Sequence, residues 1–294
     1  MSKVCILFSM EAPPNKSLQF RLIVIAQSIA IGMMVLLAGT IPRNILFAAN
    51  LHYFTDIPWA VLLIAIFLWF FWWYLNGGGG PESTAAERRA LLRARKLSGI
   101  VWIWALFAGV LGIITLVLAL RLLNTFVVLP QQQLPDLSGV PKFTILALLL
   151  MAAPVAGIVE EAAFRGYMQG PIERHCGLPV AILITGTMFA VAHLDFTFIL
   201  WPYYVTVAAI YGTVTHLTGS ILPAIVLHTG GNIYSNMDLW LHGNAEWQAA
   251  AKGNGIMLSN GAWWLGMGTV LLLSVTVWAY WRLAKVANVA GFSG

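Results

Sequence analysis

Three clusters of polar residues interrupt otherwise apolar stretches of the chain. In order, they are Glu160, Glu161 and Arg165, then Phe189 and His193, and then His228 and Asn232. An ionisable group inside an apolar span is costly to bury, so it normally faces a bundle interior or a wet cavity. A carboxylate and an imidazole that share such a cavity can supply general acid–base chemistry, because either group can take a proton from water.

The spacing within the first cluster predicts different roles for its two carboxylates. Glu161 and Arg165 lie four residues apart, one helical turn, so the carboxylate and the guanidinium can pair. Glu160 projects about 100° round the helix from Glu161 and cannot share that bond equally. We therefore predict that Arg165 neutralises Glu161, whereas Glu160 stays available as a general base or acid. The alternative is a purely structural ion pair that holds two helices in register.

The other two clusters show the same four-residue spacing. Phe189 lies one turn from His193, so its ring can form a wall of the pocket that holds the imidazole. His228 and Asn232 can present two hydrogen-bond donors in one direction, which suits a developing oxyanion. Each pattern alone is also explained by helix packing. Three such clusters, with almost no other buried charge, favour one catalytic cavity.

The elements that must position these residues are membrane-spanning helices. Of the 294 residues, 60% are hydrophobic and only 9% are charged, whereas a soluble domain carries about 25% charged residues. The apolar runs are continuous, which disfavours a transmembrane barrel with its alternating strands. At about 20 residues per span, we predict an all-α polytopic bundle of about eight transmembrane helices. The predicted spans are residues 20–41, 57–75, 100–120, 143–167, 179–194, 197–217, 220–241 and 263–281, with Pro42 at the end of the first.

These boundaries place Glu160 toward the cytoplasmic end of the fourth span and His193 toward the far end of the fifth. For the two residues to meet, the fourth span must continue past Arg165 to about Glu173, or the fifth must continue past Leu194. Either shift is close to the usual boundary error of a few residues.

Basic residues predict how the bundle is oriented. The densest basic run lies in the loop after the second span, and cytoplasmic loops are enriched in Lys and Arg. An even number of spans then places both termini in the cytoplasm. Of the sixteen Lys and Arg residues, only four fall on the other side: Arg43, Arg121, Lys142 and Lys252. We expect a multi-pass protein of a bacterial inner or plasma membrane, with an active site open toward the cytoplasmic half.

Residues 81–97 allow two interpretations. Leu91, Leu92 and Leu97 are interleaved with basic residues. The segment is therefore either an amphipathic helix that lies on the membrane surface or a solvated loop that only sets topology. The formal charge of +5 reflects such loops, and we expect a lipid bilayer rather than nucleic acid as the partner.

The three clusters, in this order along the spans, resemble the motifs of the CPBP family. That family contains the type II CAAX prenyl endopeptidases and the bacterial Abi and bacteriocin-processing proteins similar to them. The resemblance covers about residues 143–241, a third of the chain, and implies an eight-helix intramembrane endopeptidase. We accordingly divide one membrane domain into a three-span region (1–142) with a basic cytoplasmic loop (76–99), a catalytic core (143–241), and a last span with the C-terminal tail (242–294).

The resemblance also implies a role for each motif residue. Glu160 would activate water together with His193, and His228 and Asn232 would stabilise the tetrahedral oxyanion. Supporting roles would fall to Glu161, Arg165 and Phe189. The expected reaction is hydrolysis of a peptide bond in a membrane-embedded or lipidated peptide, at its C-terminal or juxtamembrane part, without an acyl-enzyme.

A divalent metal such as zinc is the alternative to this metal-free mechanism. Zinc accepts two imidazoles and a carboxylate as ligands, a set that Glu160, His193 and His228 could supply. The chain lacks the HExxH helix that places two imidazoles on one face, so the metal-free mechanism is favoured and no cofactor is expected.

Two functions of other classes stay open. One is a proton-coupled transporter that uses Glu160, Glu161 and His193 as a relay. The absence of inverted repeats argues against it. The other is a non-catalytic immunity or scaffold protein in which the same residues only hold the bundle together.

Overall fold

The computed structural model describes residues 17–127, 137, 139–194, 198–242 and 260–291. Within these ranges the chain is helical and contains no strand, which confirms the predicted all-α class. Two short elements differ from the α-helices: η2 is a 3-10 turn and η3 is a π-helix. The helices in chain order are α1 (Leu18–His52), α2 (Trp59–Leu75), η2 (Glu82–Thr84), α3 (Ala85–Leu92), α4 (Gly99–Leu123), α5 (Lys142–Glu161), η3 (Ala162–Met168), α6 (Gln169–Cys176), α7 (Leu178–Ala192), α8 (Trp201–Thr218), α9 (Leu222–His242) and α11 (Asn260–Val289).

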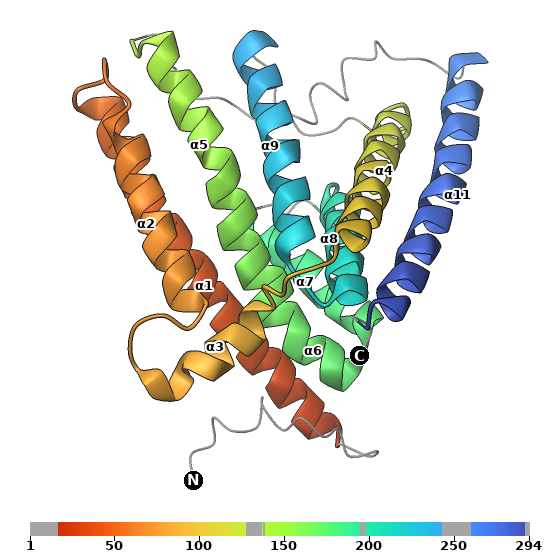
Figure 1. Cartoon of the computed structure of the whole chain (residues 1–294). Coiled ribbons are helices and arrows are strands. Elements are labelled where there is room, and N and C mark those ends of the chain that lie inside the picture. Colours follow the sequence, from red (N-terminus) through yellow and green to blue (C-terminus); the bar gives the residue numbers. More distant parts are fainter. Residues whose placement is uncertain (1–16, 128–136, 138, 195–197, 243–259, 292–294) are drawn as a thin grey trace.

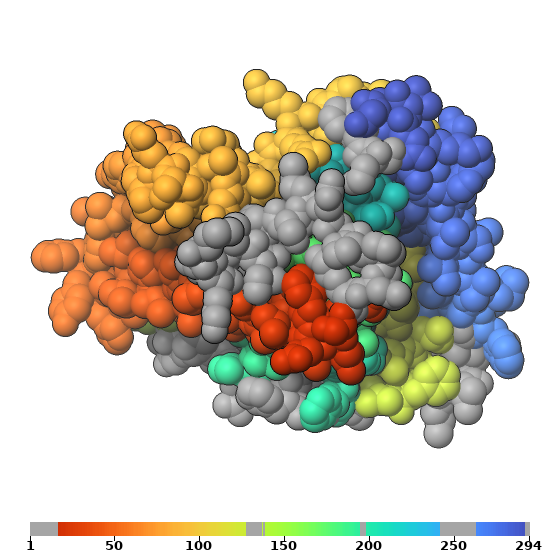
Figure 2. Space-filling view, turned by 90° about the horizontal axis from the view of Figure 1, so that it is seen from below, coloured from red at the N-terminus to blue at the C-terminus, as the bar shows by residue number. Residues whose placement is uncertain are grey.

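The long helices spread apart toward one end of the bundle and converge at the other (Figure 1). α9 lies between α5 and α4, and α11 packs along α4. The start of α1, the end of α11 and the short helices α3 and α6 all lie where the helices converge, which we call the narrow end. Figure 2 views this end and shows α2 and α3 on one side of the start of α1, with α11 on the other.

Several helices are suited to a membrane. Among the described residues, four helices are long and apolar enough to cross one, namely Leu18–His52, Gly99–Leu123, Lys142–Cys176 and Trp263–Val289. α2 and α7 are apolar but shorter, and α8 and α9 lie where two further spans are predicted. The protein is therefore a polytopic helical membrane protein, and its number of spans stays a prediction.

The first helix is longer than predicted. Pro42 was expected to end the first span, but it lies inside α1, which continues to His52. A proline removes one backbone donor from a helix. In membrane helices, neighbouring helices and local adjustments satisfy the groups that proline frees, so the residue need not terminate the helix.

The segment after α2 contains the short helix α3, so it is not simply a solvated loop, and its place relative to the membrane surface stays a prediction. α3 buries Leu91 and Leu92 in a cluster with Tyr167 of η3. Arg88 is buried as well, and its Nη2 donates to the carbonyl of Gly78 at 3.0 Å. The leucines are covered by protein rather than lipid, because α3 packs across the narrow end of the bundle.

Close approach of two helices to α5 positions the site. At Gly157 of α5, an added methyl group would collide with Oγ1 of Thr229 in α9. Gly39 of α1 allows a similarly close approach to Val159 of α5. Both contacts lie within one turn of Glu160, so α9 and α1 each bring side chains to its neighbourhood.

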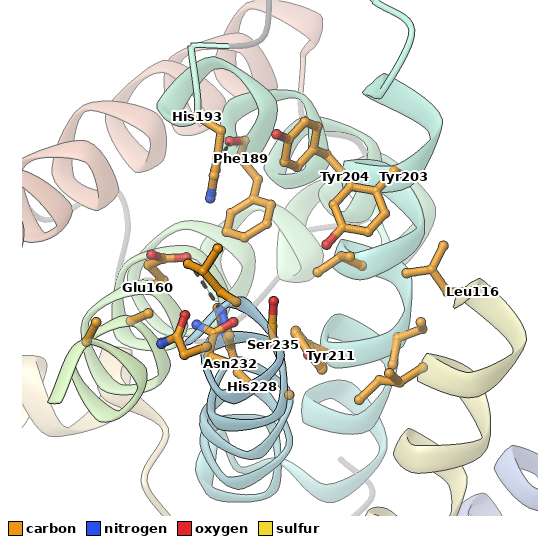
Figure 3. Close-up of a pocket in the computed structure, with 18 of the residues that line it drawn as sticks. Leu116, Glu160, Phe189, His193, Tyr203, Tyr204, Tyr211, His228, Asn232 and Ser235 are labelled. Carbon is orange, nitrogen blue, oxygen red and sulfur yellow. Dashed lines mark hydrogen bonds and ion pairs between the residues drawn. The ribbon is translucent and has the colours of Figure 1, made fainter. Parts of the chain in front are cut away.

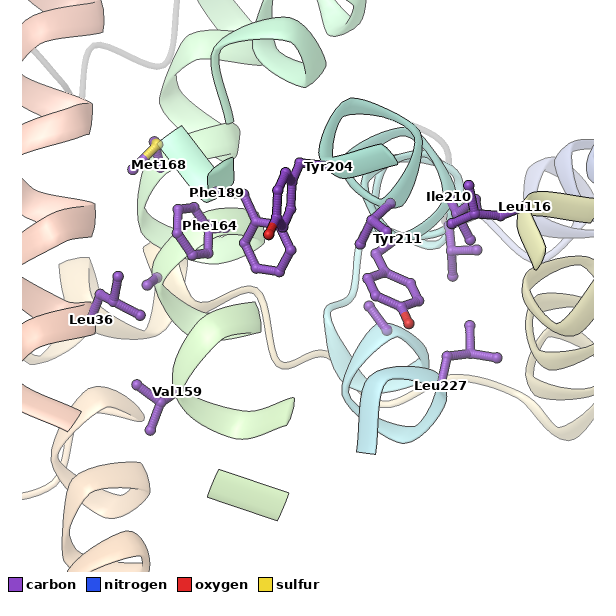
Figure 4. Close-up of a cluster of buried hydrophobic side chains, with 14 of the residues drawn as sticks. Leu36, Leu116, Val159, Phe164, Met168, Phe189, Tyr204, Ile210, Tyr211 and Leu227 are labelled. Atoms are coloured by element: carbon purple, nitrogen blue, oxygen red, sulfur yellow. The ribbon is translucent and has the colours of Figure 1, made fainter. Parts of the chain in front are cut away.

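Buried aromatic rings connect η3 with α7 and α8 (Figure 4). Phe164 packs edge-on against Phe189, with ring centroids 5.1 Å apart, and Phe189 packs against Tyr204 at 5.7 Å. These three rings belong to one core cluster that also joins α1, α4, α5 and α9. The ring of Phe189 is thereby fixed at the edge of the site.

Candidate active site

A cavity of about 410 Å³ brings together polar residues from three segments of the bundle (Figure 3). Its wall contains Glu160 from α5, His193 directly after α7, and His228 and Asn232 from α9. For Glu160 and His193 to meet, either the fourth span had to continue to about Glu173 or the fifth past Leu194. The fourth does continue, through η3 and α6 to Cys176, whereas α7 ends at Ala192. All four residues predicted to carry the chemistry therefore line one space.

Glu161 does not line this cavity, and its side chain binds Arg165 and His228. Its Oε1 accepts hydrogen bonds from Nη1 of Arg165 at 2.9 Å and from Nδ1 of His228 at 2.7 Å. The side chains of Glu161 and Arg165 are both completely buried. Nη2 of Arg165 also donates to the carbonyl of Val207 in α8 at 3.4 Å. The predicted pairing of Glu161 with Arg165 is confirmed, and it joins η3 to α5, α8 and α9.

Three aromatic rings surround the guanidinium of Arg165. Its central carbon lies 5.3 Å from the ring centroids of Phe189 and Tyr211, and 6.0 Å from that of Phe164. Ring faces attract a nearby cation, and the attraction grows when water is excluded. The rings therefore help to stabilise a positive charge that has no access to solvent.

Both histidines use Nδ1 for an internal hydrogen bond, which leaves Nε2 for the cavity. Nδ1 of His193 donates to the carbonyl of Phe189 at 2.8 Å, as Nδ1 of His228 does to Glu161. A neutral ring bonded in this way carries its lone pair on Nε2. Nε2 of His228 lies 3.8 Å from Oε2 of Glu160. Each Nε2 can thus accept a proton, and each can donate only from an imidazolium.

Glu160 presents a shielded carboxylate with a spare acceptor. Its side chain is only 13% exposed, and no described residue donates a hydrogen bond to its buried Oε2. An unsatisfied buried oxygen is costly, so native sites of this kind normally hold water or a ligand. Figure 3 shows Glu160 and His193 on the same side of the cavity, where a water could lie between them.

One protein-family model matches the part of the chain that carries this site. Residues 142–234 match the family model described as type II CAAX prenyl endopeptidase Rce1-like. This part of the chain is similar to that family, and we call residues 142–234 the Rce1-like domain. The domain begins with α5 and ends within α9, so it includes Glu160, His193, His228 and Asn232. The similarity indicates a CAAX-type protease at the level of the family, within a helical membrane bundle.

The Rce1-like domain spans about a third of the chain. No match was found among curated proteins or solved structures. Elements outside the domain nevertheless contribute to the cavity wall, with Arg43 from α1 and Ile113 and Leu116 from α4. The site of the Rce1-like domain is completed by the N-terminal part of the chain.

The sequence did not point to two tyrosines of the Rce1-like domain that touch the site histidines. The ring of Tyr211 stacks on His228, with centroids 5.3 Å apart and planes 21° apart. The ring of Tyr204 packs against His193 at 5.1 Å. The two tyrosines lie seven residues apart, two turns along one face of α8. This seven-residue spacing was the feature of the sequence that could have pointed to the two tyrosines.

The cavity of the Rce1-like domain extends away from the narrow end. Its lining runs from His228 to Leu239 on α9, and from Glu160 back to Ala152 on α5. Both directions lead to the end where the helices spread apart (Figure 1). The predicted cytoplasmic termini would make this the opposite side of the membrane, whereas the predicted opening is toward the cytoplasmic half. Both the orientation and the side of the opening stay predictions.

The metal-free mechanism and the zinc alternative both stay predictions for this site. In the part of the chain that the structure describes, no three His, Cys, Asp or Glu side chains form a group that could hold an ion. Nδ1 of His228 is engaged by Glu161, whose charge is already compensated by Arg165. The chemistry considered below therefore uses only the side chains of this protein.

Proposed function

We propose that the protein is an intramembrane endopeptidase that cleaves a membrane-embedded or lipidated peptide with a directly activated water. The observation that carries this proposal is that Glu160, His193, His228 and Asn232 line one cavity. The Rce1-like domain supports a CAAX-type protease at the level of the family. The residue roles and the substrate are the finer part of the proposal.

Glu160 and His193 supply two proton acceptors for the attacking water. Oε2 of Glu160 has a free acceptor position, and the hydrogen bond on Nδ1 of His193 leaves Nε2 available. The water gives a proton to Glu160 as its oxygen bonds to the peptide carbonyl carbon. Glu160 then returns that proton to the leaving amine as the C–N bond breaks, so the carboxylate is regenerated.

Asn232 and His228 stabilise the oxyanion that forms on the carbonyl oxygen. The amide of Asn232 donates without a change of protonation. His228 donates from Nε2 as an imidazolium, and the carboxylate of Glu161 on its Nδ1 stabilises that charge. Preorganised donors of this kind act strongly in a site that excludes water.

Asn232→Ala is expected to lower kcat by about 10²–10³-fold, the usual cost of removing one oxyanion donor. KM should change little, because the hydrogen bond is strongest in the transition state. Initial rates on a membrane peptide measure both constants. Asn236→Ala is the matched control, since Asn236 lines the same cavity but donates to the carbonyl of Leu149. Equal losses in both variants would contradict the role of Asn232.

An apolar groove between α4 and α9 supports a lipid-linked substrate. The groove has a volume of about 570 Å³ and shares Ile113, Gly231 and Ser235 with the catalytic cavity. A hydrocarbon chain in this groove would hold the attached peptide at the cavity. Each buried methylene group contributes about 0.8 kcal/mol to such binding.

Gly230→Leu is expected to raise KM for a lipidated peptide by about tenfold, the effect of excluding about two methylene groups. Gly230 lines the groove, and a Cβ added there meets no atom within 4 Å. The fold should therefore tolerate the side chain, which occupies the groove. Gly268→Leu in α11 is the control, because a Cβ there also enters open space. An equal rise in KM for the same peptide without its lipid would contradict the assignment of the groove.

The narrow end is proposed as the cytoplasmic end. The start of α1, the end of α11 and α3 lie there (Figure 1), and Arg88 and Arg89 of α3 belong to the densest basic run of the chain. Basic residues near helix ends favour the cytoplasmic side. Both termini then face the cytoplasm.

A cleavage assay tests the proposed function. The purified full chain in detergent is incubated with a library of membrane peptides, and products are identified by mass spectrometry. We expect cleavage by the wild type and none by Glu160→Ala or His193→Ala, with Glu82→Ala on the exposed turn η2 as the control. Cleavage retained in both site variants would exclude the mechanism. Loss of activity on treatment with a chelator, restored by zinc, would overturn its metal-free form.

A further inference from the structure

A second cavity lies at the narrow end of the bundle, and it shares no lining residue with the catalytic cavity. Its volume is about 130 Å³. Three segments form its wall: the end of α3 with the linker that follows it, η3 with α6, and the end of α8. α3 and α6 lie at this end of the molecule (Figure 1). Pockets for drug-sized ligands measure about 300–1,000 Å³, so this smaller cavity suits a single small group.

Three arginines line this space, which we call the narrow-end cavity. They are Arg93, Arg95 and Arg174, and Glu173 is the one carboxylate in the lining. When His216 is neutral, the lining therefore carries two more positive charges than negative ones. The charges of Arg93 and Arg174 repel each other. An anion bound between the guanidinium groups would offset this repulsion.

Glu173 is occupied by partners within the protein. Its Oε1 accepts hydrogen bonds from Nδ1 of His216 at 3.0 Å and from Nη2 of Arg93 at 3.3 Å. Its Oε2 accepts from Nε2 of Gln169 at 2.9 Å. The carboxylate thus joins α6 to α8 and to the linker after α3, and it does not neutralise all three arginines.

Arg95 and Arg174 keep hydrogen-bond donors for a ligand. Both residues are exposed, and neither takes part in an ion pair with a described residue. Nε of Arg174 donates to the carbonyl of Gly170 at 3.3 Å, which leaves its two terminal nitrogens for the cavity. A guanidinium presents its donors as a planar fork, which matches two oxygens of a phosphate group.

Backbone hydrogen bonds fix the linker that carries two of these arginines. The carbonyl of Arg93 accepts from the amide of Ile221 at 3.1 Å, and the carbonyl of Arg95 accepts from Oγ of Ser220 at 2.8 Å. The linker is therefore attached to the turn between α8 and α9. A fixed backbone lowers the entropy cost of binding a ligand to the side chains that it presents.

Close packing of α3 on η3 brings the arginines of different segments together. A Cβ added at Gly166 of η3 would lie 3.0 Å from the carbonyl oxygen of Leu91 and 3.3 Å from that of Leu92. The absence of a side chain at Gly166 lets the end of α3 lie against η3. Arg93 and Arg174 can consequently line the same cavity.

We propose that the narrow-end cavity binds the phosphate group of an anionic phospholipid. The arginine forks supply the recognition, and the excess of positive charge selects an anion. This proposal does not depend on the proposed catalysis, because none of the residues that carry it lines the catalytic cavity.

Exposed apolar side chains beside the cavity favour a lipid over a free phosphate ion. Ile100 and Ile103 lie near the start of α4, five and eight residues after Arg95, and are 51% and 64% exposed. Val180 and Leu183 are exposed near the start of α7, which follows α6 directly. Acyl chains of a lipid held at the arginines could pack along these side chains. Inorganic phosphate would use the same donors without such contacts.

The test measures lipid binding to the purified full chain in detergent, in a buffer without phosphate. Phosphatidate and phosphatidylcholine are titrated separately, and bound lipid is counted by native mass spectrometry. The Kd for phosphatidate should be at least about tenfold lower, since the positive choline group opposes binding beside arginines. Arg95→Gln and Arg174→Gln should each raise the Kd for phosphatidate about tenfold, the effect of losing one charge-assisted hydrogen bond.

Arg89→Gln is the matched control for general attraction between charges. Arg89 is an exposed arginine of the same basic run, but it does not line the narrow-end cavity. Its replacement should change the Kd less than about twofold, because isolated surface charges contribute little. Equal weakening in Arg89→Gln and Arg174→Gln would trace binding to the basic surface as a whole and overturn the cavity as the site.

The remaining outcomes are equally defined. Equal Kd values for the two lipids in the wild type would overturn the recognition of an anion. An unchanged Kd in both Arg95→Gln and Arg174→Gln would overturn the arginine site. Inorganic phosphate is then added as a competitor. Binding of phosphate as tight as that of phosphatidate would support the phosphate site but overturn the lipid as its source.

A second measurement does not depend on the folding of a variant. A ligand that binds only the folded protein raises the midpoint of thermal unfolding. Phosphatidate should raise the midpoint of the wild type by several degrees, and phosphatidylcholine should not. Equal midpoints with the two lipids would contradict the proposal. Neither measurement requires cleavage, so failure of this site would leave the proposed function intact, and absence of cleavage would leave this site intact.

Discussion

Glu160→Gln is expected to lower kcat for peptide cleavage by about 10²–10⁴-fold, the range typical of a lost general base. The amide has the size of the carboxylate but cannot take a proton from water. Because no described residue donates to Oε2 of Glu160, the substitution breaks no hydrogen bond at that atom. KM should therefore stay near its wild-type value. Initial rates over a range of peptide concentrations separate the two constants.

Two controls separate a lost base from a lost fold. Thermal unfolding of Glu160→Gln in detergent should occur within a few degrees of the wild type, because the amide matches the carboxylate in size and no hydrogen bond to Oε2 is lost. Glu82→Gln replaces an exposed carboxylate on η2 and should keep full activity. Wild-type kcat in Glu160→Gln would rule out this residue as the proton acceptor.

Arg165→Met is expected to lower the free energy of unfolding by about 3–5 kcal/mol, the usual cost of removing one partner of a buried ion pair. The substitution leaves the fully buried carboxylate of Glu161 with Nδ1 of His228 as its remaining donor. It also removes the hydrogen bond to the carbonyl of Val207 that joins η3 to α8. A loss of this size corresponds to a fall in the midpoint of thermal unfolding of about 10 °C, which can be measured in detergent.

The double variant Glu161→Gln with Arg165→Met tests the physical cause of that loss. Both charges are then absent, and the amide oxygen of the glutamine can still accept from His228. We expect the pair of substitutions to restore more than half of the lost stability, because no uncompensated charge stays buried. Equal instability of the single and double variants would trace the loss to packing around Arg165 and not to charge. Activity should not return, since His228 has lost the carboxylate that stabilises its imidazolium.

The site shows which features local geometry determines. Residues four apart on one helix are neighbours whatever the rest of the chain does. The sequence therefore sufficed to predict that Glu161 pairs with Arg165 and that Phe189 lies against His193, and both contacts are present. Composition and the continuous apolar runs sufficed in the same way to predict membrane-spanning helices. So few charged residues cannot cover the surface of a soluble domain, and continuous runs do not fit the alternating strands of a barrel.

Contacts between helices were decided only by the tertiary structure. The second partner of Glu161 is His228, 67 residues away in sequence, and no local rule connects them. Their approach depends on the missing side chain of Gly157, which lets α9 lie against α5. The distance between the site and the narrow end likewise depends on η3. This element is a π-helix, and no hydrophobic pattern predicts its wider turn.

The same distinction explains Arg43 and α3. In the sequence, Arg43 is one positive charge beside a proline, and Leu91 and Leu92 suggest a surface for lipid. In the folded chain, packing of α1 on α5 turns the arginine into a cavity residue, and the leucines are covered by protein. Periodicity along one helix determined which residues of this protein share a face. Only the packing of helices that are distant in sequence decided what each face meets, because that choice depends on the fit of all the side chains together.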